Sequence, residues 1–388
     1  MTFDFDQIID RRGTYSVKYD MAGRGKPTDV IPLWVADMDF AAPPCVLNAI
    51  ARQASHGVFG YFDTDQRYFN AVSGWMSSRF GWQVEPSWMI TTPGVINAIH
   101  VSLMALTQPG DNVIIQQPVY HPFAPAIKRL GRGLVVNQLV NDNGLYRIDF
   151  EDFESKIIQE SVKAFILCSP HNPVGRVWTR EELTRLGDIC LSHGVVVISD
   201  EIHQDFVYDG HKHLVLADLD PRLRESCVVC TAPTKTFNLP ALPVANIFIP
   251  NEDLRAAFVR AYSGFGVTQI GIMEIVSCQA AYEEGGPWLD ALLEYLAGNM
   301  ALIDSFLKSN LPDIKLIKPQ GSYLAWIDFS ALELPQGKLE ETMLHKAKLW
   351  INSGTMFGAS GEGFMRVNAA CPRSVLQAAL EQIKEAVR

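Results

Sequence analysis

Short apolar runs alternate with segments of helical periodicity through the middle of the chain. The apolar runs predict strands at Asn112–Gln116, Gly133–Val136, Ala164–Cys168, Val195–Ser199, Cys227–Thr231 and Ala245–Phe248. Several of these runs are almost continuously apolar, which is typical of strands covered on both faces. The patterns between them predict helices at Ile96–Leu106, Pro122–Leu130 and Thr179–His193. This alternation predicts an α/β fold with a mostly parallel central sheet and helices on both faces.

The C-terminal part of the chain carries a different pattern. It predicts helices at Trp288–Ser309, Leu339–Asn352 and Pro372–Val387, and strands at Tyr323–Ile327 and Phe364–Val367. We therefore expect a large domain over residues 48–286 and a smaller α+β domain formed by residues 1–47 together with 287–388. The sequence from Glu284 to Pro287, Glu-Gly-Gly-Pro, is a natural hinge between them.

Length and charge narrow the classes of function. The chain has 388 residues, more than one hydrophobic core usually supports, which agrees with two domains. Its formal net charge of −10 argues against nucleic acid or an anionic membrane as a partner. The acidic N-terminus lacks the pattern of a secretory signal, and no apolar run is long enough for a membrane span. We expect a cytoplasmic protein.

The seven cysteines are dispersed, which is typical of reduced thiols. Cys227 and Cys230 form a single CxxC pair, a spacing that also occurs in metal and redox sites. They lie in a predicted strand, however, where residues three apart point to opposite faces. The pattern favours a structural role, and we expect no metal site.

Two predicted strands end in groups of opposite charge. The run VVVISDEIH places Asp200 at the end of an apolar strand, where a buried carboxylate is costly unless it meets a cation or caps the next turn. The segment TAPTKTFNLPAL places Lys235 directly after the next strand, in surroundings of low polarity that lower the proton affinity of an amine. Because the carboxyl ends of parallel strands form the ligand-binding edge of an α/β sheet, both residues are candidates for one site.

Two further segments add polar groups at the same edge. In LCSPHNPVGRVWT, Asn172 follows a predicted strand and lies between two prolines. Its side chain is a candidate hydrogen-bond donor to a ligand, and the alternative is a structural role in a turn. In TTPGVINAIH, Gly94 marks the start of a helix, where the backbone N–H groups of Gly94, Val95 and Ile96 are candidates for binding a phosphate.

The order of these segments resembles the fold-type I enzymes that use pyridoxal 5′-phosphate (PLP), the aspartate aminotransferase superfamily. The stretches WVADMDFAAP, HGVFGYF, SDEIHQD, KTFNLPAL, GSYLAW and FMRVNAACPRS are similar to those of its MalY/PatB branch of cystathionine β-lyases. The resemblance covers essentially the whole chain. It implies the aspartate aminotransferase-like fold, PLP as the cofactor and a homodimer with shared active sites.

The resemblance also implies roles for single residues. Lys235 is expected to hold the cofactor covalently and to be the catalytic base, Asp200 to pair with the pyridine nitrogen, and Asn172 to bind the phenolic oxygen. Arg366 is expected to bind the substrate carboxylate through a bidentate contact. Tyr61 is expected to reach the site from the partner subunit. The remaining cofactor-binding and substrate-binding positions that it implies are Ala36, Gly94, Val95, Ile96, Tyr120, His203 and Thr234.

Three positions depart from the common pattern of the superfamily. Pro243 stands where an arginine often binds the phosphate, and Ala232 stands where a serine is common, which leaves Thr234 as the nearby hydroxyl. His203 replaces a frequent tyrosine. The missing arginine and the histidine agree with the β-lyase branch, whereas Ala232 has no such explanation.

The resemblance implies cleavage of a carbon–sulfur bond in a cysteine-derived amino acid, with a thiol or related sulfur species, pyruvate and ammonia as products. An aminotransferase shares the early steps and is the first alternative. A mainly regulatory role in protein binding is the second. The leaving group stays open between a thioether such as cystathionine, a cysteine S-conjugate and a sulfoxide, and Trp34, Phe62 and His121 are candidates for the residues that decide it.

Overall fold

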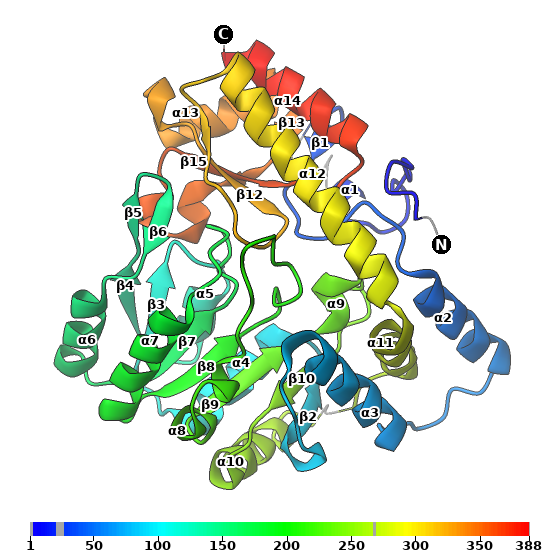
Figure 1. The fold of residues 1–388 in the computed structure, drawn as a ribbon, viewed down its shortest axis with the longest axis vertical. Helices are drawn as coiled ribbons and strands as arrows, with labels where there is room; N and C mark the ends of the chain where they lie inside the picture. Colours follow the sequence, from blue (N-terminus) through cyan, green and yellow to red (C-terminus); the bar gives the residue numbers. More distant parts are fainter. Residues whose placement is uncertain (1–2, 21–26, 267–268, 388) are drawn as a thin grey trace.

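A seven-stranded sheet forms the centre of the molecule in the computed structural model, which describes residues 3–20, 27–266 and 269–387 (Figure 1). Its strands are, in spatial order, β2 (Met89–Thr92), β10 (Ala245–Phe248), β9 (Cys227–Thr231), β8 (Val196–Asp200), β7 (Val162–Cys168), β3 (Asn112–Gln117) and β4 (Gly133–Gln138). The five strands from β9 to β4 are parallel, whereas β10 runs antiparallel to both of its neighbours. All six strands predicted in this region are therefore confirmed, and β2 adds an edge strand.

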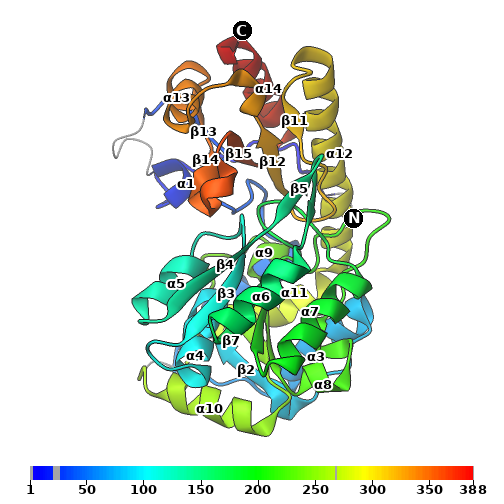
Figure 2. The ribbon, with the colours of Figure 1, turned by 90° about the vertical axis from the view of Figure 1, so that its left-hand side faces the viewer.

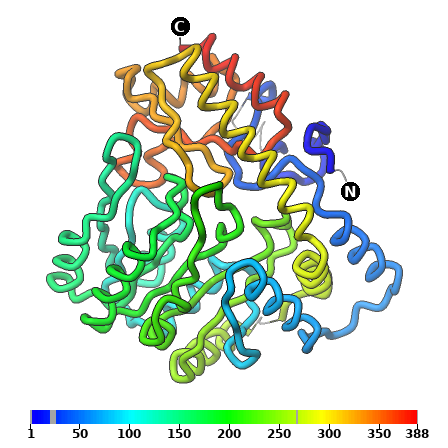
Figure 3. Tube along the Cα trace, in the orientation of Figure 1, coloured from blue at the N-terminus to red at the C-terminus, as the bar shows by residue number. Residues whose placement is uncertain are grey.

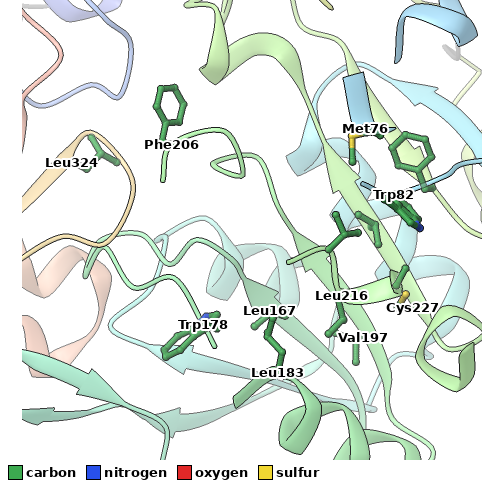
Figure 4. Close-up of a cluster of buried hydrophobic side chains, with 14 of the residues drawn as sticks. Met76, Trp82, Leu167, Trp178, Leu183, Val197, Phe206, Leu216, Cys227 and Leu324 are labelled. Atoms are coloured by element: carbon green, nitrogen blue, oxygen red, sulfur yellow. The ribbon is translucent and has the colours of Figure 1, made fainter. Parts of the chain in front are cut away.

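Helices cover both faces of this sheet, as the near-continuous apolar strands predict. One face packs against α3 (Gln66–Trp75), α6 (Phe150–Gln159), α7 (Arg180–Ser192) and α11 (Ile272–Glu284). The other face packs against α4 (Val95–Leu106), α5 (Phe123–Arg129) and α10 (Glu252–Ser263). Cys227 belongs to the first of these apolar clusters and Cys230 to the second, so their side chains point to opposite faces. Figure 4 shows Cys227 in the first cluster, with Trp82, Val197 and Leu216 nearby.

A second, antiparallel sheet lies above the first (Figure 2). It has the order β11 (Lys315–Leu316), β12 (Leu324–Asp328), β15 (Phe364–Asn368) and β14 (Asn352–Ser353). Helices α13 (Gln336–Glu341) and α14 (Arg373–Val387) pack with it around a separate apolar cluster. Helix α12 (Gly286–Asn310) joins the two regions, because Leu292 lies in the core of the large sheet and Ile303 in the core of the small one. None of the helices within the described ranges is both long and apolar enough to cross a membrane.

The helix expected at Leu339–Asn352 is wrong in its second half. After α13 the chain forms one π-helical turn, Thr342–Lys346, and then the strands β13 (Leu349–Trp350) and β14. Lys348 has a φ of 52° and ends the helical course. Its carbonyl accepts the N–H of Ile31, and β1 (Ile31–Pro32) pairs in parallel with β13. Pairing with a strand from the other end of the chain thus overrides the local helical pattern.

The N-terminal segment packs against the C-terminal region, as Figure 3 shows. Phe5 contacts Trp288 and Tyr295 of α12 through edge-on and tilted ring pairs. The remaining α-helices and strands are α1 (Val17–Asp20), α2 (Pro44–His56), α8 (Pro221–Arg224), α9 (Pro233–Thr236), β5 (Val140–Asp142) and β6 (Leu145–Arg147). The domain boundary expected between residues 47 and 48 would fall within α2, and the boundaries stay a prediction.

Candidate active site

A cavity of about 250 Å³ opens at the carboxyl ends of the parallel strands. Ten of the residues singled out in the sequence line it: Ala36, Gly94, Val95, Ile96, Tyr120, Asn172, Asp200, His203, Thr234 and Lys235. They come from the ends of β2, β3, β7, β8 and β9, and from the segment that follows β1. The fold thus brings these segments to one edge of the sheet, as expected for an α/β protein.

Lys235 lies on the short helix α9, which starts two residues after β9 ends. Burial, followed by the nearby charge of Arg366, lowers the pKa of Lys235 to about 8. Its Nζ atom donates a hydrogen bond to the carbonyl oxygen of Ala36 over 2.7 Å. At pH 7 roughly a tenth of this amine is unprotonated, which is the form that adds to a carbonyl carbon.

Asp200 is the last residue of β8 and is buried. Burial raises the pKa of Asp200 to about 7, although the N–H of Ile202 donates to its Oδ1 atom over 3.1 Å. Among the described residues no cationic side chain forms an ion pair with this carboxylate. A cationic group of a ligand would therefore gain a strong partner here.

Arg366 lies on β15, next to the cavity rather than on its wall. Its guanidinium group donates to the carbonyl oxygen of Trp34 over 2.8 Å and to Oδ1 of Asn352 over 2.6 Å, and it reaches Oδ1 of Asn172 at 3.4 Å. Its Nε atom is buried without a hydrogen-bond partner in the described structure. Burial lowers the pKa of Arg366 to about 10, so the side chain stays cationic at neutral pH.

His203 and Tyr120 lie on the cavity wall in their neutral forms. Burial, with the charges of Lys235 and Arg366, lowers the pKa of His203 to about 3, and its Nδ1 atom lies 3.3 Å from the hydroxyl of Ser322. Burial raises the pKa of Tyr120. Both rings can therefore contact a ligand without adding charge.

The first turn of α4 faces the cavity, but one of its expected donors is already used. Gly94 precedes the helix with a φ of 96°, which favours glycine, and its N–H donates to the carbonyl oxygen of Thr92 over 2.8 Å. The expectation that the N–H of Gly94 is free is therefore wrong. Val95, Ile96 and Asn97 follow, at helical positions whose N–H groups have no partner within the helix.

Tyr61 lies outside this cavity. Its side chain is 96% exposed, and Val58 and Phe59 in the same segment are also largely exposed. Within one chain the described structure therefore does not bring Tyr61 to the other candidates. Exposed apolar side chains grouped in this way are typical of a protein–protein interface.

The cavity wall includes Pro243 and also five residues that the sequence did not single out for the site: Pro93, Asn97, Cys168, Ile202 and Pro240. Each stands within a few positions of a predicted site residue, and this proximity was the available signal. Cys168 accepts the N–H of Asn172 at its Sγ atom over 3.5 Å, so this thiol helps to fix the Asn172 loop. Pro243, which replaces the common arginine, adds no charge.

The chain matches the profile of the aminotransferase class I and II family over residues 28–383. The chain belongs to this family. It is 45% identical over 99% of its length to the whole of cystathionine beta-lyase PatB from Bacillus subtilis, and 33% identical over its full length to 99% of the protein MalY from Escherichia coli. These similarities place it in the MalY/PatB branch.

The solved structures agree with this membership. Cystalysin from Treponema denticola, whose crystals contain a pyridoxal 5′-phosphate cofactor, superimposes on the chain with a TM-score of 0.97. The two are 37% identical, and the alignment covers 100% of this chain and 99% of cystalysin. The fold predicted from the sequence, that of the aspartate aminotransferase-like enzymes, is confirmed.

Proposed function

We propose that this member of the MalY/PatB branch is a PLP-dependent carbon–sulfur β-lyase. The observation that carries the proposal is that Lys235 and Asp200 line the same cavity. Lys235 is an amine of lowered pKa, and Asp200 is a buried carboxylate that has no ion-pair partner among the described residues. The cystathionine β-lyase name of PatB, together with 45% identity over nearly the whole chain, supports this reaction over transamination.

The residues of the cavity fit PLP in three respects. Asp200 offers a negative charge to a protonated pyridine nitrogen, and that pairing would stabilise a carboxylate whose pKa burial now raises. Lys235 offers an amine to the aldehyde. The first turn of α4, with the N–H groups of Val95 and Ile96 and the hydroxyl of Thr234 nearby on the wall, offers donors to the phosphate. Lys235 is the only cation on the described part of the wall, so neutral donors would hold the phosphate.

Asn172, Tyr120 and His203 would complete the cofactor site. We assign the amide of Asn172 to the phenolic oxygen and the ring of Tyr120 to the face of the pyridine. Neutral His203 would lie beside the cofactor without competing with Asp200 for the pyridine proton. PLP, when bound, supplies an electron sink for the pair of electrons left behind when a proton leaves Cα.

Lys235 would carry the proton transfers. Its free Nζ atom would take the Cα proton, because burial lowers the pKa of this amine to about 8, so that roughly a tenth of it is unprotonated at pH 7. Arg366 would bind the substrate carboxylate through its two-pronged guanidinium group, and the backbone at Ala36 would line the same subsite. Tyr61 would enter from the partner subunit of a homodimer, in agreement with its exposure here.

The overall reaction cleaves the Cβ–S bond. Substrate and one water molecule give a thiol, pyruvate and ammonia when the substrate is a thioether such as cystathionine. A sulfoxide or another S-conjugate of cysteine would give the corresponding sulfur species. We expect the reaction to take place in the cytoplasm with a small amino acid as substrate.

A substrate screen tests the proposal. Purified holoenzyme is incubated with cystathionine, S-alkylcysteines and their sulfoxides in the absence of any keto acid, and pyruvate and free thiol are measured. From the thioethers we expect both products in equal amounts, whereas a sulfoxide should give pyruvate and a sulfenic acid in place of the thiol. Conversion that requires a keto acid and yields no thiol would instead identify an aminotransferase.

A further inference from the structure

The segment from Trp34 to Phe40 lines the active-site cavity at Ala36, and side chains from elsewhere in the chain hold its carbonyl groups. Arg366 donates to the carbonyl oxygen of Trp34, and Asn368 donates to those of Val35 and Asp37 over 2.7 and 2.6 Å. Asn238, three residues after Lys235, donates to those of Met38 and Phe40 over 3.0 and 2.8 Å. We call residues 34–40 the N-terminal strap.

The carbonyl oxygen of Ala36 is the point at which the strap meets Lys235. It accepts the amine of Lys235 over 2.7 Å and the hydroxyl of Tyr323 over 2.9 Å. Tyr323 is fully buried. The position of this one carbonyl group therefore fixes the acceptor that the free amine of Lys235 meets.

A cluster of four charges, of which Lys18 and Asp39 are buried, lies behind the strap. Lys18 of α1 is fully buried, and its Nζ atom lies 2.7 Å from Oδ2 of Asp39 and 3.8 Å from Oδ1 of Asp37. Arg11 completes the cluster, since its guanidinium group lies 2.5 Å from Asp37 and 2.8 Å from Asp39. Two cations thus face two carboxylates, and both carboxylates belong to the strap.

A cluster of this kind is better suited to fixing geometry than to adding stability. The cost of removing Lys18 and Asp39 from water offsets much of the attraction within the cluster, so apolar residues at these two positions would stabilise the fold about as well. Removal of one partner, in contrast, leaves an uncompensated buried charge. The balance of the four charges therefore holds Asp37 and Asp39, and with them Ala36 between Trp34 and Asp37, in one place.

We propose that Arg11, Lys18, Asp37 and Asp39 are positioning residues that hold the N-terminal strap so that the carbonyl group of Ala36 receives the free amine of Lys235 and Arg366 stays beside the cavity. This deepens the proposed function and rests on it for the substrate readout. The free amine of Lys235 is then paired with a backbone carbonyl group, whose position depends on charges outside the cavity.

The charges around Lys235 give the direction of the expected change. Arg366 lowers the pKa of Lys235, whereas Asp37 and Asp200 raise it. When Asp39 loses its charge, two cations compete for Asp37 alone. The strap then shifts toward them, Lys235 loses its acceptor, and the pKa of Lys235 falls further.

The test compares Asp39→Asn, Lys18→Met and the double variant Lys18→Met/Asp39→Asn with the wild-type chain. In cofactor-free protein, reductive methylation of Lys235 by formaldehyde and cyanoborohydride is followed across pH by mass spectrometry of the Lys235 peptide. In holoenzyme, KM and kcat are measured with cystathionine. For Asp39→Asn we expect a methylation midpoint at lower pH and a KM raised about tenfold, with kcat changed less than KM. The double variant, which again balances one cation with one carboxylate, should recover both values.

Glu182→Gln is the matched control, because Glu182 forms a partly buried ion pair with Arg176 away from the cavity. It should lower thermal stability without moving the midpoint or KM. The proposal is overturned if folded Asp39→Asn behaves like this control, or if the double variant is no better than Asp39→Asn. Should Asp39→Asn not fold, Asp39→Glu keeps the charge and moves it by one methylene; a smaller shift in the same direction supports the proposal, and wild-type values overturn it.

The two readouts separate this inference from the proposed function. The methylation midpoint is measured without cofactor or substrate, so it reports on the strap even if cystathionine is not cleaved. If the wild-type chain shows no lyase activity but Asp39→Asn still shifts the methylation midpoint, the proposed reaction is wrong and the proposed role of the strap stands.

Discussion

The guanidinium group of Arg366 reaches the amide oxygen of Asn172 at 3.4 Å, although the two residues are 194 positions apart. Arg366 lies on the small sheet, and Asn172 follows β7 of the large one. We assign the first to the substrate carboxylate and the second to the phenolic oxygen of the cofactor. Their contact therefore links the two halves of the site across the junction of the two sheets.

Replacement of Arg366 tests this link. We expect Arg366→Lys to lower kcat/KM by about 10²-fold or more, because a single ammonium cannot form a bidentate contact with a carboxylate. Most of the loss should be in KM. Arg366→Met should lose more. Steady-state kinetics with cystathionine measure both, and a wild-type KM in Arg366→Lys would assign the carboxylate to another residue.

Replacement of Lys235 tests the proposed proton transfer and cofactor attachment most directly. Lys235→Ala should lower turnover by about 10³-fold or more, since it removes the base that acts at Cα. Lys235→Arg should be equally inactive, because a guanidinium stays protonated and cannot hold the cofactor. Borohydride reduction followed by peptide mass spectrometry should find PLP on residue 235 of the wild-type chain only. A reducible adduct in Lys235→Ala would place the attachment on another lysine.

Asp200 makes a prediction for stability in the cofactor-free protein. Its pKa is about 7 in the folded chain against an ordinary value of 3.8, so the folded state binds more protons than the unfolded state between these values. This group therefore lowers the free energy of unfolding as pH rises from about 4 to 7, by at most roughly 4 kcal/mol. Asp200→Asn should remove this loss, and cofactor-free Asp200→Asn should be the more stable protein at pH 8.

Urea denaturation of the cofactor-free proteins at pH 5 and pH 8 measures the difference. Addition of PLP should reverse the order at pH 8, since the wild-type carboxylate then gains its cationic partner. Asp304→Asn is a suitable control, because Asp304 forms only an exposed ion pair with Lys308 on α12. Equal stability of Asp200→Asn and wild type at both pH values without PLP would contradict the assignment of a raised pKa.

The sequence predicted most of the site because parallel strands bring their carboxyl ends together. Asp200 ends one apolar strand and Lys235 follows shortly after the next, so their proximity followed from the fold class alone. Asn352 shows where this reasoning stops. Its segment has a helical pattern, yet Asn352 lies on β14, because β1 pairs with the neighbouring strand β13. There its side-chain oxygen accepts a hydrogen bond from the guanidinium group of Arg366. Contacts between distant segments of this kind leave no local signal.

The N-terminal strap could be predicted only through its resemblance to a known branch. The residues from Trp34 to Phe40 show no periodicity of a helix or strand, and their conformation depends on Asn238, Asn368 and the four-charge cluster. Lys18 in particular reads as a surface residue, since lysine is rarely buried without a partner, and its partners lie about twenty positions away. Its burial is a property of the folded chain.

Tyr61 makes the prediction that depends on assembly. Because its side chain is 96% exposed and outside the cavity of its own chain, its proposed role requires a second subunit. Tyr61→Ala and Lys235→Ala should each be inactive as homodimers. In a mixture unfolded and refolded together, each mixed dimer would contain one site with an intact Lys235 and an intact partner Tyr61. Random pairing should then restore about a quarter of the wild-type activity.

The control is Tyr15→Ala in place of Tyr61→Ala, since Tyr15 is equally exposed but has no proposed role. Tyr15→Ala should be active alone, so its mixture with Lys235→Ala should show no recovery beyond the activity of its own sites. If Tyr61→Ala and Lys235→Ala fail to complement each other while size-exclusion chromatography shows mixed dimers, Tyr61 does not act across the interface. Full activity of the Tyr61→Ala homodimer would remove the residue from the site altogether, because a side chain that contacts a reacting group cannot be lost without cost.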